Sequence, residues 1–357
     1  MSGMYAIYRS PPSSLDSPGI QTSLEPPVAP RQDHTLTTHD QIRHDPYYWM
    51  REREDARTIA YLEAENEYTR AALGHTQELQ EKLFEEIVGR IQQDDSSVPY
   101  HDRGAWYYQR YIEGGEYPLY ARRVGSLDAP EEILVDGNLR AEGKEYFASI
   151  SPAISSDDRV IAWAEDHVGR RIYTLFFKDL ETGELLPERI EQVTGNFAWA
   201  RDGQSLLYAR QDPETLRSDR IFLHRLGTDP AEDRLLFEET DDTFSTYVWR
   251  TRDRKYLVIG SFQTLSNEYR FIDATDPTGE WTLFEPRSRD HEHTIAHRGD
   301  HWYVLTNTDG ATNFQLMSVP ENALGRENWT EVIAHREDVF LSSFDVFDDY
   351  LVLSERS

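Results

Sequence analysis

The chain has 357 residues, of which 65 are acidic and 37 are basic, giving a formal net charge of −28 at pH 7. Such a charge repels nucleic acids and anionic membranes and attracts cationic partners. Cysteine is absent, which excludes disulfides and thiolate chemistry. No apolar run approaches the roughly 18 residues of a membrane span, and no secretory signal opens the chain. These features predict a cytoplasmic protein with no nucleic-acid or membrane partner.

The basic residues are almost all arginines, because only four of them are lysines. An acidic surface with little lysine is typical of proteins adapted to high salt. A GC-rich genome that favours arginine in an ordinary acidic protein explains the same composition. Both interpretations stay open from the sequence.

The first part of the chain is predicted to be a loose arm followed by helices. Residues 1–40 carry repeated prolines that block regular structure, so we expect no element there. Residues 41–95 form the predicted helical segment, with two helices between residues 55 and 91. Gly74 is the expected stop of the first helix, and Thr76 is the expected N-cap of the second.

The second predicted helix carries one apolar stripe, because its apolar residues recur at spacings of three and four. That stripe has to bury against another surface, either the β domain that follows or a partner absent from this chain. The stripe consists of Leu79, Leu83, Phe84, Ile87, Val88 and Ile91.

Residues 96–357 change to short β segments with a regular repeat. The polar turns step by 45, 51, 47 and 49 residues, and each precedes an apolar or aromatic strand. The turn residues used for this count are Asp157, Asp202, Asp253, Asp300 and Asp349. A period of about 40–50 residues with four strands is the signature of a β-propeller. A β-sandwich with irregular loops is the alternative, but it does not explain the regular step. We expect the aromatic strands to pack blade against blade rather than to form a ligand cage.

The number of units indicates an incomplete ring. Five full units lie between about residues 98 and 336, and a sixth begins near Asp338 and stops after its second strand. A propeller needs a closed ring, because an open blade leaves backbone groups unpaired at its edge. The sequence therefore predicts a truncated piece of a longer protein.

Motifs of catalysis are absent from the sequence. There is no G-x-S-x-G elbow, no H-E-x-x-H, no P-loop and no zinc-type array. We therefore predict no catalytic, cofactor-binding or metal-binding residue in this chain, and no cofactor.

Histidines form the densest polar cluster of the sequence, with His291-Glu292-His293 followed by His297 and His301. His291 and His293 lie two residues apart, so on a strand they share one face and could seed a metal site. The spacing matches no closed set of metal ligands. We favour a histidine-rich hairpin at the surface, hydrogen-bonded to its own turn.

Acidic residues gather in three short runs, which are Asp94-Asp95, Glu238-Glu239 and Asp241-Asp242. One interpretation is that they steer basic peptides toward a central tunnel. A solvated rim is the simpler interpretation of any single run. Only the summed charge favours steering.

Several segments resemble one family of serine peptidases. They are His44–Arg51, Tyr61–Asn66, Glu85–Ile91, Glu113–Tyr117, Ala164–Asp166, Asp179–Gly183 and Asp290–His293. From about Pro26 to Ser357 the chain resembles the prolyl oligopeptidase family, and within it the oligopeptidase B group.

The resemblance implies a cytosolic peptidase that cleaves short peptides after Arg or Lys. In that family a seven-bladed propeller covers an α/β-hydrolase domain with Ser, Asp and His, and excludes folded proteins. The N-terminal helices pack on the hydrolase domain, which would explain the apolar stripe. That domain follows the propeller and is absent here, so no catalytic residue carries over. The missing hydrolase domain is the implied structural partner.

The resemblance and the incomplete ring leave three hypotheses for the function. The first is a truncated oligopeptidase B, inactive alone, whose parent enzyme acts on short basic peptides. The second is a stand-alone propeller that binds basic peptides or a partner protein. The third is a split enzyme, completed by a separate hydrolase polypeptide. A binding module should close its ring, so the end of the chain within a blade favours the first.

Overall fold

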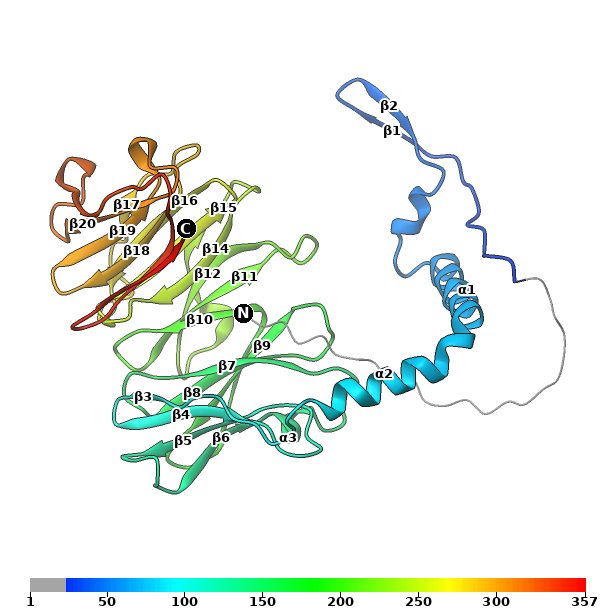
Figure 1. Ribbon diagram of the computed structural model, residues 1–357, viewed down its shortest axis with the longest axis horizontal. Helices are drawn as coiled ribbons and strands as arrows, with labels where there is room; N and C mark the ends of the chain where they lie inside the picture. Colours follow the sequence, from blue (N-terminus) through cyan, green and yellow to red (C-terminus); the bar gives the residue numbers. More distant parts are fainter. Residues whose placement is uncertain (1–23) are drawn as a thin grey trace. The chain divides into compact units, whose positions relative to one another are not determined.

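A computed structural model describes residues 24–357, which divide after Gln92 into two compact units (Figure 1). Each unit is described by itself. The first 23 residues, with the prolines at 11, 12 and 18, lie outside the described part of the predicted arm.

The first unit begins with a hairpin that the sequence did not predict. Strand β1 (Thr35–Thr38) pairs antiparallel with β2 (Gln41–His44). The expectation of no regular structure up to residue 40 is therefore wrong for its last residues. The last proline of the arm is Pro30, and His39 and Asp40 adopt positive φ values of 50° and 60°, as a two-residue hairpin turn requires.

The two predicted helices of this unit are confirmed. After a 3₁₀ turn η1 (Tyr48–Arg51), α1 spans Ala56–Leu73, a second turn η2 spans Gly74–Thr76, and α2 spans Gln77–Gly89. Asp55 caps α1 by accepting a hydrogen bond from the Arg57 backbone N–H at 2.9 Å.

The joint between the helices differs from the prediction in its details. Gly74 follows α1 with a right-handed φ of −56°, so it does not stop the helix in the left-handed way expected of glycine. Thr76 precedes α2, but its hydroxyl donates to the Leu73 carbonyl at 2.7 Å instead of capping α2. The apolar stripe on α2 is exposed, with 57% of Leu79 and 56% of Ile87 accessible to solvent.

The second unit is built from consecutive antiparallel blades. The first blade pairs β3 (Tyr100–Asp102), β4 (Ala105–Arg110), β5 (Leu119–Val124) and β6 (Glu131–Asp136) in chain order, followed by α3 (Gly137–Ala141). The fourth contains β14 (Ser245–Arg250), β15 (Tyr256–Gln263), β16 (Ser266–Asp273) and β17 (Thr282–Glu285). The fifth contains β18 (His293–Arg298), β19 (His301–Thr306), β20 (Gln315–Pro320) and β21 (Thr330–Ile333). Two strands, β22 (Phe340–Val346) and β23 (Leu351–Arg356), form a sixth sheet.

The second and third blades share one strand. They form a seven-stranded sheet of β7 (Ala148–Ile154), β8 (Val160–Asp166), β9 (Tyr173–Asp179), β10 (Leu185–Trp199), β11 (Ser205–Gln211), β12 (Ser218–Arg225) and β13 (Arg234–Glu238). Up to Val193, β10 pairs with β9, and from Val193 onward it pairs with β11. The predicted five blades and part of a sixth are thus confirmed. Single 3₁₀ turns occur at Pro230–Glu232, Thr308–Gly310 and Arg326–Asn328.

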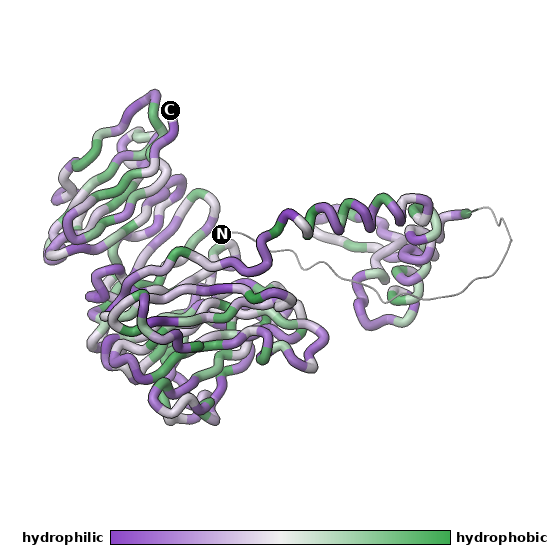
Figure 2. The backbone as a smooth tube through the Cα atoms, turned by 60° about the horizontal axis from the view of Figure 1, so that its bottom comes forward, coloured by the Kyte–Doolittle hydropathy of each residue, from purple (hydrophilic) through white to green (hydrophobic). Residues whose placement is uncertain are grey.

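The core lies between neighbouring blades, as the repeat predicted. Leu207 and Ile221 of the third blade share one buried cluster with Val248 and Leu257 of the fourth. In the next cluster, Val258 of the fourth blade packs with residues of β19. Apolar residues follow the strands of the blades, and polar residues dominate many of the turns (Figure 2). Among the helices described from residue 24 onward, none has the length and apolar character to cross a membrane.

Candidate functional site

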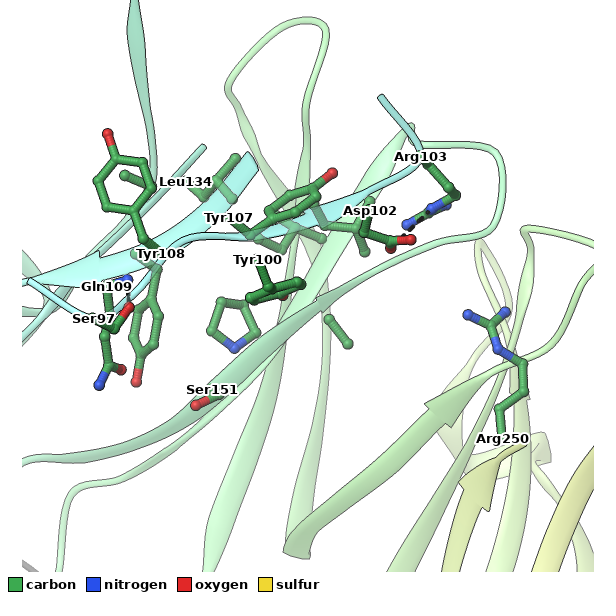
Figure 3. Close-up of a pocket in the computed structure, with 16 residues that line it drawn as sticks. Ser97, Tyr100, Asp102, Arg103, Tyr107, Tyr108, Gln109, Leu134, Ser151 and Arg250 are labelled. Carbon is green, nitrogen blue, oxygen red and sulfur yellow. Dashed lines mark hydrogen bonds and ion pairs between the residues drawn. The ribbon is translucent and has the colours of Figure 1, made fainter. Parts of the chain in front are cut away.

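A cavity of about 320 Å³ lies between the first and second blades. Tyrosine rings from the first blade line one side of it, and residues of β7 line another. The four rings are Tyr100, Tyr107, Tyr108 and Tyr120, and we call this cavity the tyrosine pocket (Figure 3). In Figure 3, Arg103 and Arg250 lie on the right, and Tyr108 and Gln109 lie on the left.

The hydroxyl group of Tyr108, on the wall of the tyrosine pocket, is fixed by two hydrogen bonds. Tyr108 donates to Glu131 at 2.7 Å and accepts from the Arg123 guanidinium at 3.0 Å. Burial raises the pKa of Tyr100, whose ring stacks on Tyr107 at 5.5 Å between centroids. Tyrosine rings beside apolar side chains suit the binding of an apolar or aromatic group.

A second cavity of about 400 Å³ is lined by Arg103, Ser156, Arg201, Asp253 and Arg254. Arg103 lines both cavities, so they adjoin. Arg250 donates a hydrogen bond to Ser156 Oγ at 2.7 Å. Burial lowers the pKa of Arg250 to about 10, and the nearby positive charge of Arg254 adds to this effect. We call Arg103, Arg201, Arg250 and Arg254 the arginine cluster.

The predicted histidine cluster does not form a surface hairpin. His291, His293 and His297 are 5%, 1% and 2% exposed. His293 and His297 lie on the buried face of β18, and His291 lies just before that strand. The prediction of a shared face is confirmed, since the His291 and His293 rings stack 4.5 Å apart. His301 lies apart from them and pairs with Asp300 at 2.6 Å.

His291 and His293 are neutral side chains at pH 7. Arg326 donates to His291 Nδ1 at 2.9 Å, and His291 Nε2 lies 3.1 Å from Thr306 Oγ1. Burial and the charge of Arg326 lower the pKa of His291 to about 4. Burial likewise lowers the pKa of His293 to about 3. Within residues 24–357, no group of three or more His, Cys, Asp or Glu side chains is arranged to hold a metal ion.

His297 links two blades through carboxylates. Its Nδ1 lies 2.6 Å from Asp253, in the turn before β15, and its Nε2 lies 3.0 Å from Glu321, just after β20. Both ring nitrogens are therefore occupied by carboxylates, which leaves neither to activate a hydroxyl nucleophile. We interpret this arrangement as a structural link.

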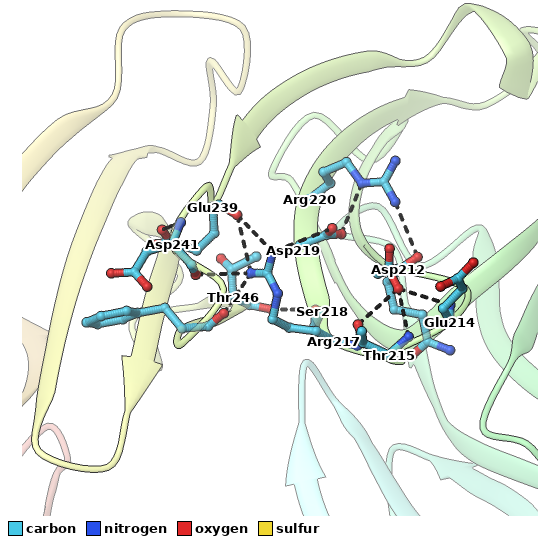
Figure 4. A network of polar contacts seen from close by, with 12 residues as sticks. Asp212, Glu214, Thr215, Arg217, Ser218, Asp219, Arg220, Glu239, Asp241 and Thr246 are labelled. Carbon is cyan, nitrogen blue, oxygen red and sulfur yellow. Dashed lines mark hydrogen bonds and ion pairs between the residues drawn. The ribbon is translucent and has the colours of Figure 1, made fainter. Parts of the chain in front are cut away.

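The acidic runs have mixed roles. Glu239 is 2% exposed and pairs with Arg287 at 2.9 Å, so it is a buried ion pair rather than part of a solvated rim. Asp241 and Asp242 are exposed. Arg217 donates to the main-chain carbonyls of this segment, which fixes it against β12 (Figure 4). Asp95 accepts a hydrogen bond from the Ser96 backbone N–H at 2.9 Å.

Sequence reasoning missed the tyrosine pocket and the arginine cluster. A signal was present, because arginine recurs in the turns after the first strands of blades, at Arg103, Arg201 and Arg254. The arrangement of the blades around the ring determines which turns lie close together. The spacing of the repeat in the sequence does not predict this arrangement.

Residues 26–357 match the family model of the prolyl oligopeptidase N-terminal β-propeller domain. The chain belongs to the prolyl oligopeptidase family. The resemblance that the sequence motifs indicated is confirmed, and so is the propeller fold.

Two curated relatives place the chain within this family. It is 41% identical over 356 residues to dipeptidyl aminopeptidase BI of Pseudoxanthomonas mexicana, covering 95% of this chain and 49% of that protein. It is 33% identical over 337 residues to protease 2 of Moraxella lacunata, covering 92% of this chain and 48% of that protein. The chain spans about half the length of the curated relatives it matches.

Solved structures agree with this assignment. Oligopeptidase B from Leishmania major superimposes with a TM-score of 0.86 at 28% identity, covering 94% of this chain and 50% of that one. Oligopeptidase B from Trypanosoma brucei gives 0.86 at 25% identity, covering 93% and 49%. In each comparison the matched part is about half of the known structure.

Proposed function

We propose that this chain is the N-terminal and propeller portion of an oligopeptidase-B-like serine peptidase, which hydrolyses short peptides after Arg or Lys. The propeller restricts access of substrates to a hydrolase domain. The observation that carries the proposal is the family match over residues 26–357, combined with coverage of only half of each relative. The net charge of −28 supports a preference for basic peptides.

In this proposal the chain supplies no catalytic residue, and the Ser, Asp and His of the family belong to the hydrolase domain. The contacts of His297 support this, because both ring nitrogens face carboxylates within the propeller unit. The exposed apolar stripe of α2 is the surface that would meet the hydrolase domain. We place the protein in the cytoplasm.

A second candidate is the release of N-terminal dipeptides. It is favoured by the 41% identity to a relative named dipeptidyl aminopeptidase BI. The two candidates differ in what a hydrolase domain would require of the substrate. An aminopeptidase of this kind needs a free N-terminus, whereas an endopeptidase accepts an N-terminally blocked peptide.

The test is reconstitution. The purified chain alone is expected to leave a blocked chromogenic arginine peptide intact. Addition of the C-terminal half of the P. mexicana relative is expected to give hydrolysis. Turnover by this chain alone, after removal of contaminating proteases, would refute the assignment of catalysis to a separate domain. Cleavage of free but not blocked arginine peptides would favour the aminopeptidase.

A variant of α2 tests the partner surface. Ile87→Ser is expected to weaken reconstitution about 10-fold, since burying one large aliphatic side chain is worth about 1.5–3 kcal/mol. Its own unfolding should barely change, because Ile87 is 56% exposed. Glu81→Ser on the same helix is the matched control. Equal reconstitution by both variants would contradict this use of the stripe.

A further inference from the structure

The arginine cluster brings positive charge together in a strongly acidic chain. Arg103 lies in the turn between β3 and β4, and Arg201 follows β10. Arg250 ends β14, and Arg254 lies in the turn before β15. The first, third and fourth blades therefore contribute guanidinium groups to one region, within a protein whose net charge is −28.

Two members of the arginine cluster are held by carboxylates. Arg103 pairs with Asp102 at 3.4 Å and with Asp158 at 3.0 Å, and it also donates to the Ser155 carbonyl at 2.6 Å. Arg254 pairs with the same Asp102. These contacts fix the two side chains and join blades, which is a structural role.

The other two members lack such partners. Arg250 makes its hydrogen bond to the neutral Ser156 hydroxyl. Between residues 24 and 357, the Arg201 guanidinium makes no hydrogen bond or ion pair, although its backbone N–H is bonded to the Ala274 carbonyl. A guanidinium carries five N–H donors, so both groups keep donors for a ligand. Its planar fork matches the two oxygens of a carboxylate.

The carboxylates near the second cavity limit the charge of its ligand. The cavity is lined by Arg103, Arg201 and Arg254 and by one carboxylate, Asp253, while Asp102 and Asp158 pair with Arg103. Among residues 24–357, no carboxylate forms an ion pair with Arg201 or Arg250, although the charges of Asp273 and Asp102 act on them at longer range. A monoanion can pair with these two guanidinium groups, whereas a dianion would be repelled by the surrounding carboxylates.

The tyrosine pocket adds a second recognition element. It shares Arg103 with the second cavity, and Arg250 lies on its wall. Its volume of about 320 Å³ accommodates a single large side chain. A ligand that enters both cavities must therefore carry a carboxylate next to an apolar or aromatic group.

We propose that the arginine cluster binds the C-terminal carboxylate of a peptide, while the tyrosine pocket takes the last side chain of that peptide. The choice of a peptide rests on the proposed function, and the carboxylate rests on the two cavities alone. Such a site would hold peptides by the end distant from their N-terminus. It would favour short peptides with a free, apolar C-terminal residue.

The test measures binding to the full 357-residue chain by isothermal titration calorimetry, so it needs no hydrolysis. The peptide Ala-Ala-Phe with a free C-terminus is expected to bind at least about 10-fold more tightly than its C-terminal amide, because a charge-assisted pair is lost. Ala-Ala-Ala should bind more weakly than Ala-Ala-Phe. Inorganic phosphate is the third probe and should bind weakly.

Variants separate binding from folding. Arg201→Gln removes an exposed, unpaired guanidinium and should reduce affinity for Ala-Ala-Phe several-fold without lowering the unfolding temperature. Arg250→Gln should reduce it further. Arg289→Gln is the control for charge, because the Arg289 side chain is 93% exposed and lies outside both cavities.

Each result decides the proposal. Equal affinity for the acid and the amide, absence of binding, or equal effects of Arg201→Gln and Arg289→Gln would overturn it. Phosphate binding tighter than Ala-Ala-Phe binding would overturn the peptide assignment in favour of a small-anion site. A failure here with successful reconstitution would leave the peptidase proposal intact, and the reverse result would leave the carboxylate site intact.

Discussion

Protonation of His224 is expected to stabilise the propeller unit below pH 9. His224 is fully buried on β12, with Nδ1 2.8 Å from Asp233 and Nε2 3.5 Å from Glu188. Burial alone would lower the pKa of this imidazole, but the two carboxylates outweigh it and raise the pKa to about 9. The longer contact contributes less, so Asp233 is the main partner.

The direction and size of the effect follow from linkage. A raised pKa gives stabilisation that is complete below the unfolded value of 6.5 and is lost as the pH rises through about 9. The loss between pH 6 and pH 9 is about 3 kcal/mol, at 1.36 kcal/mol for each pKa unit. His224→Gln keeps a donor for Asp233 but removes the charge, so it should lack this loss.

Urea unfolding of the wild type and of His224→Gln, followed by tryptophan fluorescence from pH 6 to pH 9, measures the effect. The difference in unfolding free energy should shrink by about 3 kcal/mol over that range, since titrations common to both proteins cancel. His301→Gln is the control, because that side chain is 40% exposed. A difference that stays constant with pH would refute the assignment of a charged His224.

Three further changes test the packing of the blades. Glu165→Gln should cost about 3 kcal/mol in urea unfolding, because this carboxylate is 1% exposed and pairs with Arg140 at 2.6 Å; a loss below 1 kcal/mol would contradict that role. The unfolding free energy of the wild type should fall by about 2 kcal/mol between pH 7.5 and pH 5, because His291 is protonated in the unfolded chain but, with a pKa of about 4, stays neutral in the folded one. The unfolding free energy of His291→Gln should fall less over the same range. Gly260→Ala should lower the unfolding temperature by an amount equivalent to about 1–3 kcal/mol, because its new Cβ would lie 2.5 Å from the Phe262 ring; an unchanged temperature would show that the ring moves freely.

The sequence predicted the blades because their signals are local. A polar turn followed by an apolar strand needs no knowledge of distant residues, and the strand after Asp157 is buried throughout as Val160–Asp166. Strand β10 shows the limit of this reasoning. Pro187 and Gly195 within it mark breaks in a local pattern, yet the strand continues with register shifts and serves two blades.

The histidines show which features of a cluster can be predicted from a sequence pattern. Spacing placed His291 and His293 on one face, and their stacked rings confirm it. Spacing could not tell that this face is buried, because the covering side chains belong to another blade: Tyr269 packs edge-on against His293 at 4.9 Å. The identity of that neighbour depends on the ring of blades, and not on the local sequence.

The arginines of the proposed site differ from other arginines of the fold in their partners. Several arginines that join elements of the fold are paired with a buried carboxylate, as in Arg140 with Glu165 and Arg287 with Glu239, whereas Arg217 is held by main-chain carbonyls. The chain has 65 acidic residues from which such partners could be drawn. Arg250 is nevertheless half-buried beside a neutral serine, at the cost of a lowered pKa. Arg250 thus keeps donors that no carboxylate of the described chain engages at ion-pair distance, and this is the feature on which the proposed carboxylate site rests.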